Sequence, residues 1–584
     1  MEKCDSWGAR LAPFMCWIGE LKKPETLRAD LIAGITVALV LVPQSMAYAQ
    51  LAGLPPYYGL YASFLPGIVA ALFGSSRQLA TGPVAVVSLM TASALEPIAG
   101  SSPELYVAYA IMLAFMVGVF QMSLGLLRLG VLVNFLSHPV VVGFTNAAAI
   151  IIGTSQLGKL FGVSVERSEH TYETVYNMVV EAFYSTHFET MLMAILALGL
   201  MIGMKRLLPK IPSVLTAVVV TTVISWQIGF EAMGGKVVAS IPEGLPALAL
   251  PVFDFDTMVK LISVAVAIAI IGFMEAISVA KAMAARTRQR LDANQELIGQ
   301  GLGNIFSSLS SGYAVSGSFS RSAVNINAGA VTGFSAVVTG VVVGITLLFL
   351  TPLLYHLPQA TLASVIIMAV INLVKIEPIK YAWKVQKHDA VVAVITFVLT
   401  LLWAPHLDKG IMVGVLLSLS LFLYRSMKPR VAVLSRAPDG TLRDVEVHKL
   451  ETCRNISLIR FDGSLYFANT GYFEDVVLER AATKPDLKYI IIDAEGINSI
   501  DATGEEMLHN LADRLGETGV ELLFARTKKQ VWDVFRRTGL TEKLGEDHFF
   551  ALRTHAFNYA WDKLGDNHAE TCPLRLAPPK EAEA

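Results

Sequence analysis

Charged side chains are scarce in most of this 584-residue chain. Asp, Glu, Lys and Arg make up 16% of the residues, whereas an average soluble domain has about 25%. The shortage is confined to residues 1–425, where about one residue in nine is charged, against about three in ten in residues 426–584. The mean hydropathy is +0.55. These figures exclude a wholly soluble protein, and we expect a large membrane domain followed by a soluble one.

Cysteines are also few, and Cys4, Cys16, Cys453 and Cys572 show no paired spacing. We therefore expect isolated reduced thiols, with no zinc site and no disulfide framework. No phosphate-binding P-loop occurs, so ATP is not the expected energy source. The stretch GQGLGN at 299–304 does not fit a dinucleotide-binding fingerprint, because no strand precedes it. We expect no enzyme activity, no metal, no cofactor and no nucleic-acid partner.

Long apolar runs fill the first part of the chain, and a helix needs about 20 such residues to cross a bilayer. We predict about fourteen spans, some of them short or broken. Their approximate positions are 30–49, 57–74, 82–97, 104–126, 131–157, 187–205, 212–230, 256–282, 292–311, 318–330, 332–352, 358–374, 389–404 and 409–425.

The distribution of basic residues gives the expected topology. With the N-terminus in the cytoplasm, the basic loops fall inside and a mostly acidic loop falls outside, as the positive-inside rule requires. An even number of spans returns the C-terminus to the cytoplasm. We predict a cytoplasmic segment at 1–29, a membrane domain at 30–428, a soluble domain at 440–566 and a flexible tail at 567–584. The absence of a signal peptide and of organelle targeting favours a bacterial inner membrane.

The third and tenth segments each begin with a Gly/Ser/Thr-rich turn that leads into a short helix. Thr81 can cap the first of these helices with Pro83 at its first position, and Ser316 or Ser318 can cap the second. Short interrupted segments at corresponding positions of two halves indicate a transporter binding site. Because they lie seven segments apart, they enter the membrane from opposite sides. Two helix N-termini would then meet near the midplane, where their free N–H groups favour an anion.

Arg321 is the only Asp, Glu, Lys or Arg between Leu297 and Val374. A charge at mid-bilayer depth costs several kcal/mol, with estimates from roughly 2.5 upward. Arg321 lies about one turn into the second half-helix, so it adds positive charge where the two N-termini meet. We interpret it as part of an inorganic-anion site. The alternative is an arginine that pairs with a carboxylate or with carbonyls to hold helices together.

Three further polar residues lie in predicted spans. Glu275 is six residues before Lys281 in the eighth span, and a carboxylate there can carry a proton coupled to anion movement. It can instead be a structural partner for Arg321 or line a cytoplasmic vestibule. Gln44 and Tyr48 follow the helix-breaking Pro43 on neighbouring turns, where they can face the site. Alternatively, they supply an interhelical hydrogen bond and packing.

Three stretches resemble the sulfate permease (SulP) family of anion transporters: PQSMAYAQLAGLPPYYGLYASF at 43–64, ATGPVAVVSL at 80–89 and SGSFSRSAVNINAGA at 316–330. The resemblance covers nearly the whole chain. It implies a membrane domain of two inverted repeats of seven spans, with core and gate parts. It also implies an anion site between the third and tenth helices, a homodimer and an elevator-like motion.

The same resemblance assigns site residues. Glu275 matches the acidic position of proton-coupled members, and Val84 stands where animal chloride exchangers and the motor protein often have phenylalanine. The latter difference favours the plant-like and microbial sulfate transporters. Sulfate is the leading substrate, since a divalent anion gains more from a positive field; bicarbonate, chloride, nitrate and dicarboxylates remain open. The substrate-binding positions implied by the family are Gln44, Tyr48, Val84, Ala85, Ser320 and Arg321.

After residue 430, strand patterns alternate with helix patterns, which predicts a small α/β domain. It resembles the STAS domain that follows SulP transporters. Related bacterial proteins carry a phosphorylated hydroxyl at a position that matches Thr503, within Asp501-Ala-Thr-Gly504. We favour a plain helix cap at Thr503, because such caps are common and the neighbouring glutamates would repel a phosphate. We expect the domain to support dimerisation, trafficking or binding of a cytoplasmic protein.

The leading hypothesis is a secondary active transporter of inorganic anions, with proton-coupled sulfate uptake by an elevator mechanism. Two alternatives belong to other classes. One is a membrane anion sensor that signals through the soluble domain, and the other is a passive channel. The broken helices favour transport over signalling.

Overall fold

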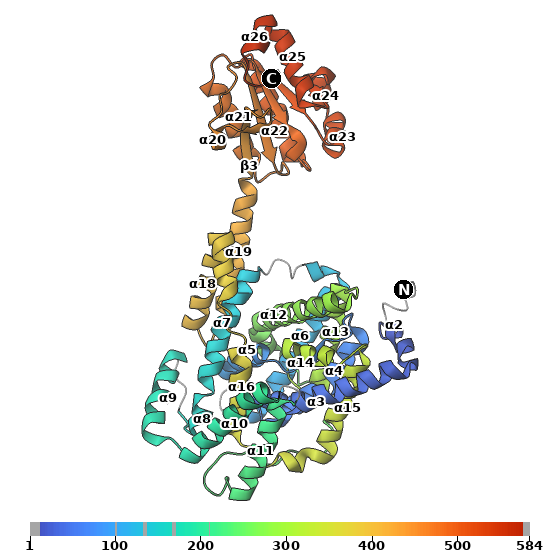
Figure 1. The fold of residues 1–584 in the computed structure, drawn as a ribbon, viewed down its shortest axis with the longest axis vertical. Helices are drawn as coiled ribbons and strands as arrows, with labels where there is room; N and C mark the ends of the chain where they lie inside the picture. The colour runs from blue at the N-terminus through green and yellow to red at the C-terminus, as the bar shows by residue number, and fades with distance from the viewer. Residues whose placement is uncertain (1–11, 100–101, 132–136, 166–170, 209–210, 576–584) are drawn as a thin grey trace, which may run out of the picture. The chain divides into compact units, whose positions relative to one another are not determined.

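The structure is a computed structural model that describes residues 12–99, 102–131, 137–165, 171–208 and 211–575. The chain divides into two compact units, Met1–Ser418 and Leu419–Ala584. The first unit is helical apart from two short strands, and the second contains a six-stranded sheet. Figure 1 shows their elements.

The first unit contains the helices predicted for the membrane domain. Its elements are α2 (Met15–Ile18), α3 (Pro24–Leu51), α4 (Tyr57–Phe73), β1 (Ala80–Gly82), α5 (Ala85–Ala99), α6 (Pro103–Leu126), α7 (His138–Ser155), α8 (Leu157–Phe161), α9 (Thr171–Ser185), α10 (Phe188–Leu207), α11 (Ser213–Ile228), α12 (Phe255–Thr287), α13 (Ala293–Leu309), β2 (Ser316–Ser318), α14 (Phe319–Asn327), α15 (Phe334–Ile345), α16 (Gln359–Ile371), α17 (Glu377–Val385), α18 (Lys387–Leu402) and α19 (Leu407–Met427). The last helix continues past the boundary between the units.

These helices differ widely in length, and some are shorter than a complete membrane span. Within the described residues, seven helices are long and apolar enough to cross a membrane, and four shorter apolar helices have 10–17 residues. Short α4, α5, α11 and α16 correspond to predicted segments. The acidic stretch predicted as an outer loop contains helix α9, and the basic stretch after α16 contains α17. Both helices are too polar for the apolar pattern to have shown them.

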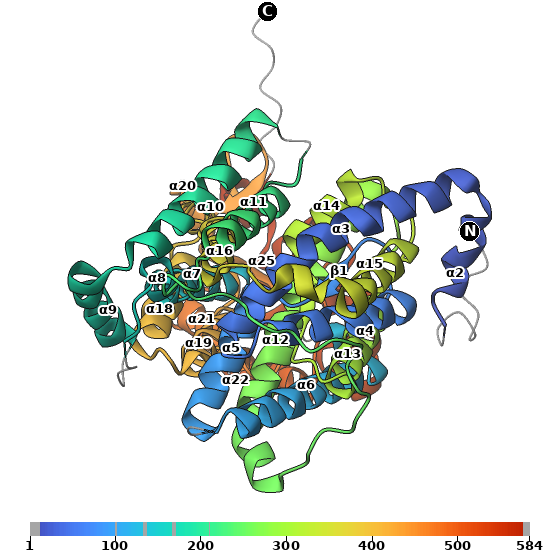
Figure 2. The same ribbon diagram turned by 90° about the horizontal axis from the view of Figure 1, so that it is seen from below.

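The helices of the first unit form two groups. In one group α3, α4, α6, α12, α13 and α15 pack together, and in the other α7, α10, α11, α16 and α18 do. Figures 1 and 2 show the two groups from perpendicular directions. Strands β1 and β2, with the half-helices α5 and α14 that follow them, lie within the first group.

Helix α13 packs through glycines rather than through large side chains. A Cβ added at Gly299 would lie 2.4 Å from Cα of Gly74, at the end of α4. A Cβ at Gly301 would lie 2.5 Å from the backbone nitrogen of Met122 in α6. Small residues at such crossings let helix backbones approach closely in membranes. The glycines of GQGLGN therefore serve helix packing.

Asp30, near the start of α3, is fully buried and is held by the turn between α14 and α15. Its Oδ1 accepts hydrogen bonds from the backbone N–H groups of Val331 (2.7 Å) and Thr332 (3.1 Å). Its Oδ2 accepts the hydroxyl of Thr332 at 2.5 Å. A hydrogen bond to a charged group is worth about 1.5–3 kcal/mol. This carboxylate therefore fixes α3 to the segment that follows the second half-helix.

Replacing Asp30 with alanine is expected to lower the free energy of unfolding by about 2–4 kcal/mol, because three hydrogen-bond donors lose their acceptor. Thermal unfolding of the purified protein in detergent measures the effect as a clear fall in melting temperature. Asp30→Asn is the matched control, since its amide oxygen can still accept the two backbone bonds, and its loss should be smaller. An Asp30→Ala variant as stable as the wild type would contradict the role given to this carboxylate.

The second unit is an α/β domain built on one mixed sheet with strand order β4-β3-β5-β6-β7-β8. Strand β3 is antiparallel to β4 and β5, whereas β5, β6, β7 and β8 run parallel. The elements are β3 (Arg430–Arg436), β4 (Leu442–Asp444), α20 (Val445–His448), β5 (Ile456–Asp462), α21 (Thr470–Thr483), β6 (Tyr489–Asp493), α22 (Ala502–Glu517), β7 (Glu521–Ala525), α23 (Lys529–Thr538), α24 (Leu540–Leu544), β8 (Phe549–Phe550), α25 (Arg553–Leu564) and α26 (Asp566–Thr571).

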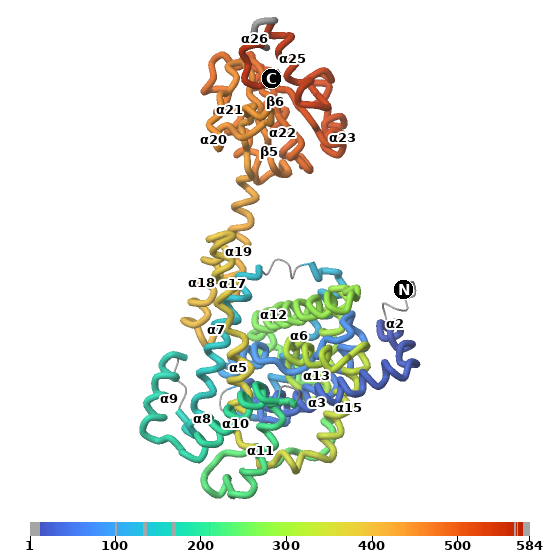
Figure 3. The backbone as a smooth tube through the Cα atoms, viewed as in Figure 1, coloured from blue at the N-terminus to red at the C-terminus, as the bar shows by residue number. Residues whose placement is uncertain are grey.

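Each face of this sheet has its own apolar core. Ile490 and Ile492 of β6 belong to the cluster that contains buried residues of α21, α22 and α23, whereas Tyr489 and Ile491 belong to the cluster with α25. This alternation is expected for a strand covered on both faces. Strands β5 and β6 are labelled beside α21 and α22 in Figure 3. The sequence predicted β5, β6, β7 and helices α21, α22 and α23, but not β3, β4 or α25.

The cysteines differ from the expected isolated reduced thiols. Cys16 is disulfide-bonded. Cys453 and Cys572 are free and buried in one apolar cluster, where the Cys572 thiol hydrogen-bonds to Cys453. This bond, the backbone N–H of Asn455 and the nearby Lys484 ammonium lower the pKa of Cys453 to about 6. The contact and burial raise the pKa of Cys572. The prediction of isolated reduced thiols is therefore wrong for Cys16, whereas Cys453 and Cys572 are reduced as predicted but lie in one cluster. Cys4 lies outside the described residues.

The contact with Cys572 belongs to a wider packing of the chain end. Leu574 is buried, and Nε of Arg436 donates to its carbonyl oxygen at 2.9 Å. Cys572 and Leu574 therefore belong to the core of the second unit, although they fall in the segment 567–584 predicted as a flexible tail. The rest of that segment, from residue 576, lies outside the described residues.

Candidate functional site

The two interrupted segments predicted from the sequence meet as a pair of antiparallel strands. Ala80 pairs with Ser318, Thr81 with Gly317 and Gly82 with Ser316. All residues of both strands are buried. Half-helix α5 begins at Ala85, soon after β1, and α14 begins at Phe319, directly after β2. Because the strands are antiparallel, the chain enters the two half-helices in opposite directions, as the predicted inverted arrangement requires.

The capping residues agree with the prediction at one half-helix and differ at the other. Ser318 caps α14, with its Oγ accepting from the backbone N–H of Arg321 at 3.5 Å. Thr81, predicted to cap α5, instead lies in β1, where its Oγ1 accepts from Nε2 of Gln300 at 2.9 Å. The first backbone bond of α5 runs from Ser88 N to the carbonyl of Val84 at 3.0 Å. Gln300 therefore holds β1 against α13.

Arg321 is fully buried at the junction of the two half-helices. Its Nη1 donates to Oε1 of Gln44 at 3.2 Å, and Nε2 of Gln44 donates to the Tyr48 hydroxyl at 3.1 Å. Its Nε and Nη2 are buried without a hydrogen-bond partner. A Cβ added at Gly82 would lie 3.3 Å from Nη2. Arg321 thus turns toward β1, and its guanidinium keeps two unused donors there.

The structure brings some of the predicted site residues into contact and places the others nearby. Gln44, Tyr48 and Arg321 form one chain of hydrogen bonds. Val84 and Ala85 are buried at the start of α5. Ser320 is exposed on the first turn of α14, where its Oγ contacts Oγ of Ser318 at 3.3 Å.

Glu275 lies on α12, which packs against β2. Ser316 donates to the carbonyl of Gly272 at 2.6 Å, and a Cβ added at Gly317 would lie 3.0 Å from Cα of Ala276. Helix α12 is one continuous helix of 33 residues, and it is labelled in the backbone trace of Figure 3. Oε2 of Glu275 is buried without a partner, although the charges of Glu275 and Arg321 interact. The two residues form no ion pair within 4 Å, so the helix-holding alternative finds no direct contact between these described side chains.

Two buried groups that support the site were not predicted. The hydroxyls of Ser88 and Tyr313 are 3.0 Å apart and join α5 to the segment before β2. The side chain of Asn304 is fully buried and binds the backbone of Val315 twice, accepting from N at 2.8 Å and donating to O at 3.1 Å. Polar residues in the apolar runs were the available signal, but their partners lie too far along the chain to infer.

In the second unit, the predicted cap at Thr503 is wrong. Asp501 caps α22, with Oδ1 accepting from the backbone N–H of Gly504 at 2.8 Å and Oδ2 from that of Phe467 at 2.9 Å. Thr503 is an exposed residue of the first turn. Asp caps at least as well as Thr, and it precedes Thr503 by two residues. The hydroxyl is accessible, but its modification stays a prediction.

Comparisons with known proteins match both units. The sulfate permease family matches residues 27–396, and the STAS domain matches residues 448–555. The chain is 38% identical over 569 residues to "Probable sulfate transporter 4.2" of Arabidopsis thaliana, covering 94% of this chain and 83% of that one. It is 33% identical over 554 residues to "High affinity sulfate transporter 2" of Stylosanthes hamata, covering 91% and 83%.

Solved structures give the same fold. The murine Solute Carrier 26 family member A9 anion transporter, in the inward-facing state, matches with a TM-score of 0.86 at 24% identity, covering 96% of each chain. The transmembrane domain of the cyanobacterium bicarbonate transporter BicA matches with a TM-score of 0.58 at 26% identity, covering 68% of this chain and 97% of that one. The predicted fold class, a multi-span helical membrane domain followed by an α/β STAS domain, is confirmed.

The fold and the matches define a multi-pass membrane transporter of anions, not an enzyme. The chain belongs to the sulfate permease family.

Proposed function

We propose that this protein is a secondary active transporter that takes up sulfate together with a proton. The observation that carries the proposal is the fully buried Arg321, whose Nε and Nη2 have no partner at the place where two half-helices begin. An uncompensated guanidinium at such depth is costly unless a ligand uses it. A tetrahedral oxyanion accepts hydrogen bonds from the guanidinium fork. The free guanidinium donors favour an anion because they can hydrogen-bond to it. The helix N-termini favour an anion because their free N–H groups carry partial positive charge.

The residues proposed to bind the anion are those of the sequence analysis. Arg321 supplies charge and donors, and Gln44 holds the guanidinium through its Oε1. Tyr48 orients Gln44. Val84, Ala85 and Ser320 stand at the first turns of the half-helices, where backbone N–H groups can face the anion.

Sulfate is the proposed substrate for two reasons. The plant relatives that match over most of the chain are named as sulfate transporters. A doubly charged anion also gains about twice as much as a singly charged one from the same positive field. Bicarbonate is the second candidate, because one structural match above 25% identity is named as a bicarbonate transporter.

Glu275 is the proposed proton carrier. It lies on the helix that packs against β2, its Oε2 is buried without a partner, and its charge interacts with that of Arg321. A proton on Glu275 changes the local charge by one unit and can therefore affect anion occupancy.

We further propose an elevator-type motion, a homodimer, cytoplasmic termini and an inner-membrane location. We also propose that the STAS domain docks a cytoplasmic protein and that Thr503 is its modifiable hydroxyl.

The test is uptake of radiolabelled sulfate into proteoliposomes of the purified protein, with and without an inward proton gradient. We expect accumulation above equilibrium only with the gradient, and inhibition by unlabelled sulfate. The same preparation is challenged with bicarbonate, chloride, nitrate and succinate. Strong competition by one of these anions without sulfate uptake would mean that this anion, and not sulfate, is the substrate. Sulfate binding without flux of any anion would support the sensor alternative, and flux that never exceeds equilibrium would support a channel.

A further inference from the structure

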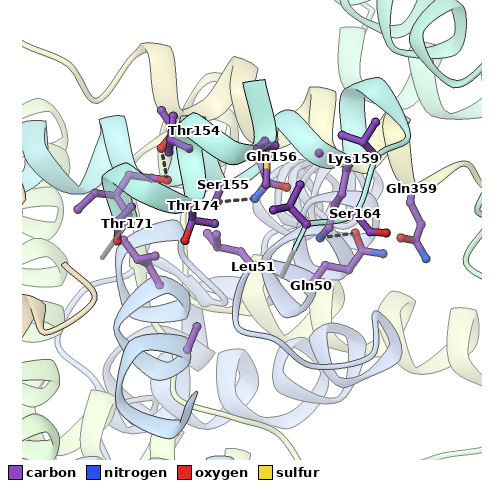
Figure 4. A pocket seen from close by; sticks show the side chains of 18 of the residues that line it. Gln50, Leu51, Thr154, Ser155, Gln156, Lys159, Ser164, Thr171, Thr174 and Gln359 are labelled. Carbon is purple, nitrogen blue, oxygen red and sulfur yellow. Dashed lines mark hydrogen bonds between the residues drawn. The ribbon is translucent and has the colours of Figure 1, made fainter. Parts of the chain in front are cut away.

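A cavity of about 420 Å³ lies between the two helix groups of the first unit. Figure 4 shows that side chains from several helices point into it. Its lining includes the end of α3, one side of α5, the end of α7, helix α8 and part of α9. Its volume exceeds that of a sulfate ion several times, so it can hold an anion with part of its hydration shell, since one water occupies about 30 Å³ of liquid.

The cavity begins one helical turn away from the proposed anion site. On α3, Leu51 of the lining lies three residues after Tyr48, and on α5, Leu89 lies four residues after Ala85. These spacings keep each pair on one side of its helix and separate it by about 4.5–6 Å along the axis. Leu51 and Leu89 are both buried. Leu51 and Leu89 of the lining therefore lie about one helical turn from Tyr48 and Ala85 of the proposed anion site.

The polar wall of the cavity carries an excess of positive charge. Lys159 and Lys236 both line it, together with Glu96. Glu96 is already engaged in an interaction of its own. Nζ of Lys159 donates to Oε1 of Gln50 at 3.3 Å, whereas Nζ of Lys236 has no hydrogen bond or ion pair with a described residue. Two ammonium groups thus share one cavity, and five of their six N–H donors have no hydrogen-bond partner among the described residues.

The neutral lining groups leave few other donors. Thr154 and Ser155 donate to carbonyls of their own helix, and Gln156 donates to Oγ of Ser155. Gln50 uses its oxygen to accept from Lys159, which leaves its Nε2 as a donor. Figure 4 shows Gln50, Lys159 and Gln359 near one another on one side of the cavity. Lys159, Lys236 and Nε2 of Gln50 therefore offer N–H groups to a ligand in the cavity, which favours an oxyanion.

The cavity lies at those ends of the membrane helices that we expect to face the outside of the cell. It takes in the C-terminal ends of α3 and α7 and the N-terminal ends of α10 and α16. The basic last turn of α10, with Lys205 and Arg206, is at the opposite end. Under the positive-inside rule that opposite end is cytoplasmic, so the cavity faces outward.

We propose that this cavity is a second, outer anion site, where Lys159 and Lys236 hold an inorganic oxyanion before it moves to Arg321. The inference rests on the proposed transport function. An anion there competes with Gln50 for Lys159, so its arrival breaks a hydrogen bond at the end of α3, two residues beyond Tyr48. The net positive charge of the lining raises the local concentration of the anion at the outer site.

The first experiment measures equilibrium binding of radiolabelled sulfate to the full-length protein at fixed ionic strength. Arg321→Ala removes the deep site and should keep a weaker sulfate-binding component. Adding K159Q and K236Q to this variant should weaken that component at least tenfold, because the two changes remove both ammonium groups of the cavity and the charge-assisted hydrogen bonds they offer. Lys260→Gln, which also removes a lysine but does not line the cavity, should leave it unchanged. No residual binding in Arg321→Ala, or equal binding in the triple variant, would overturn the proposal.

The second experiment keeps Arg321, so it does not depend on the folding of the first variant. Uptake of external sulfate is measured in intact cells that express the K159Q/K236Q protein. We expect the half-saturation concentration to rise at least threefold with little change in maximal rate, and Lys159→Arg with intact Lys236 to behave as wild type. Unchanged half-saturation would overturn the outer site. If the wild type carries no sulfate but the lysine-dependent binding is present, the outer site stands and the proposed substrate fails.

Discussion

Replacing Arg321 with alanine is expected to abolish concentrative sulfate uptake and to weaken sulfate binding at the deep site by about 100-fold. The side chain is fully buried and offers two unpartnered donors, Nε and Nη2. Loss of two charged hydrogen bonds at about 1.5 kcal/mol each corresponds to about two powers of ten in affinity. Binding of radiolabelled sulfate at fixed ionic strength, with uptake into proteoliposomes, measures both effects.

The matched control for this change is Arg321→Lys. Lysine keeps the positive charge but not the planar fork of donors, so its affinity should fall between those of the wild type and the alanine variant. The melting temperature of each variant reports separately on folding. An alanine variant that is folded and takes up sulfate at the wild-type rate would remove Arg321 from the binding site and would favour a helix-holding role.

Replacing Glu275 with glutamine is expected to abolish uptake driven by a proton gradient while preserving exchange of sulfate across the membrane. Glutamine has nearly the size of protonated glutamate but cannot release or take up the proton. Uptake by the wild type should fall as the external pH rises, because the protonated, uncharged form of Glu275 is the one that accompanies the anion. The variant should show a flat pH dependence. Counterflow of labelled sulfate against unlabelled internal sulfate measures the exchange that remains.

Glu104→Gln is the matched control for Glu275, since Glu104 is exposed in the first turn of α6 and outside the site. This control should couple uptake to the gradient as the wild type does. If Glu275→Gln still accumulates sulfate above equilibrium with the proton gradient, another group carries the proton. If it loses exchange as well, Glu275 is needed for anion movement itself, in agreement with its interaction with Arg321.

The arrangement of the half-helices was predictable because the third and tenth segments carry a local signal. Turn residues precede a short apolar helix in both, and Ser318 caps the second as expected. The pairing of the two segments as antiparallel strands was not predictable. Each strand has three residues, which is too few for a period of two to show, and the partners Ala80 and Ser318 are far apart in sequence.

The site could be predicted only in part, because many of its side chains form hydrogen bonds with residues far away in the sequence. Threonine is a common helix-capping residue, yet the hydroxyl of Thr81 accepts a hydrogen bond from Gln300, 219 positions later in the chain. Asn304 and Tyr313 were polar residues in apolar runs without a visible partner. Gln44 and Tyr48 were expected near the site, and the structure links them to Arg321, with Gln44 bonded to the guanidinium and Tyr48 bonded to Gln44. Residue types could therefore indicate a polar junction, but only the fold shows which groups are already satisfied and which remain unused.

The glycine crossings of α13 limit where a transport cycle can deform the protein. At Gly299 and Gly301 this helix touches α4 and α6 through backbone atoms, with no intervening layer of flexible side chains that could rearrange as the helices slide. Sliding by even one residue would bring larger side chains into positions that accept only hydrogen. We therefore expect the three helices to move together in a transport cycle, with β1 and the first half-helix tied to them through Gln300.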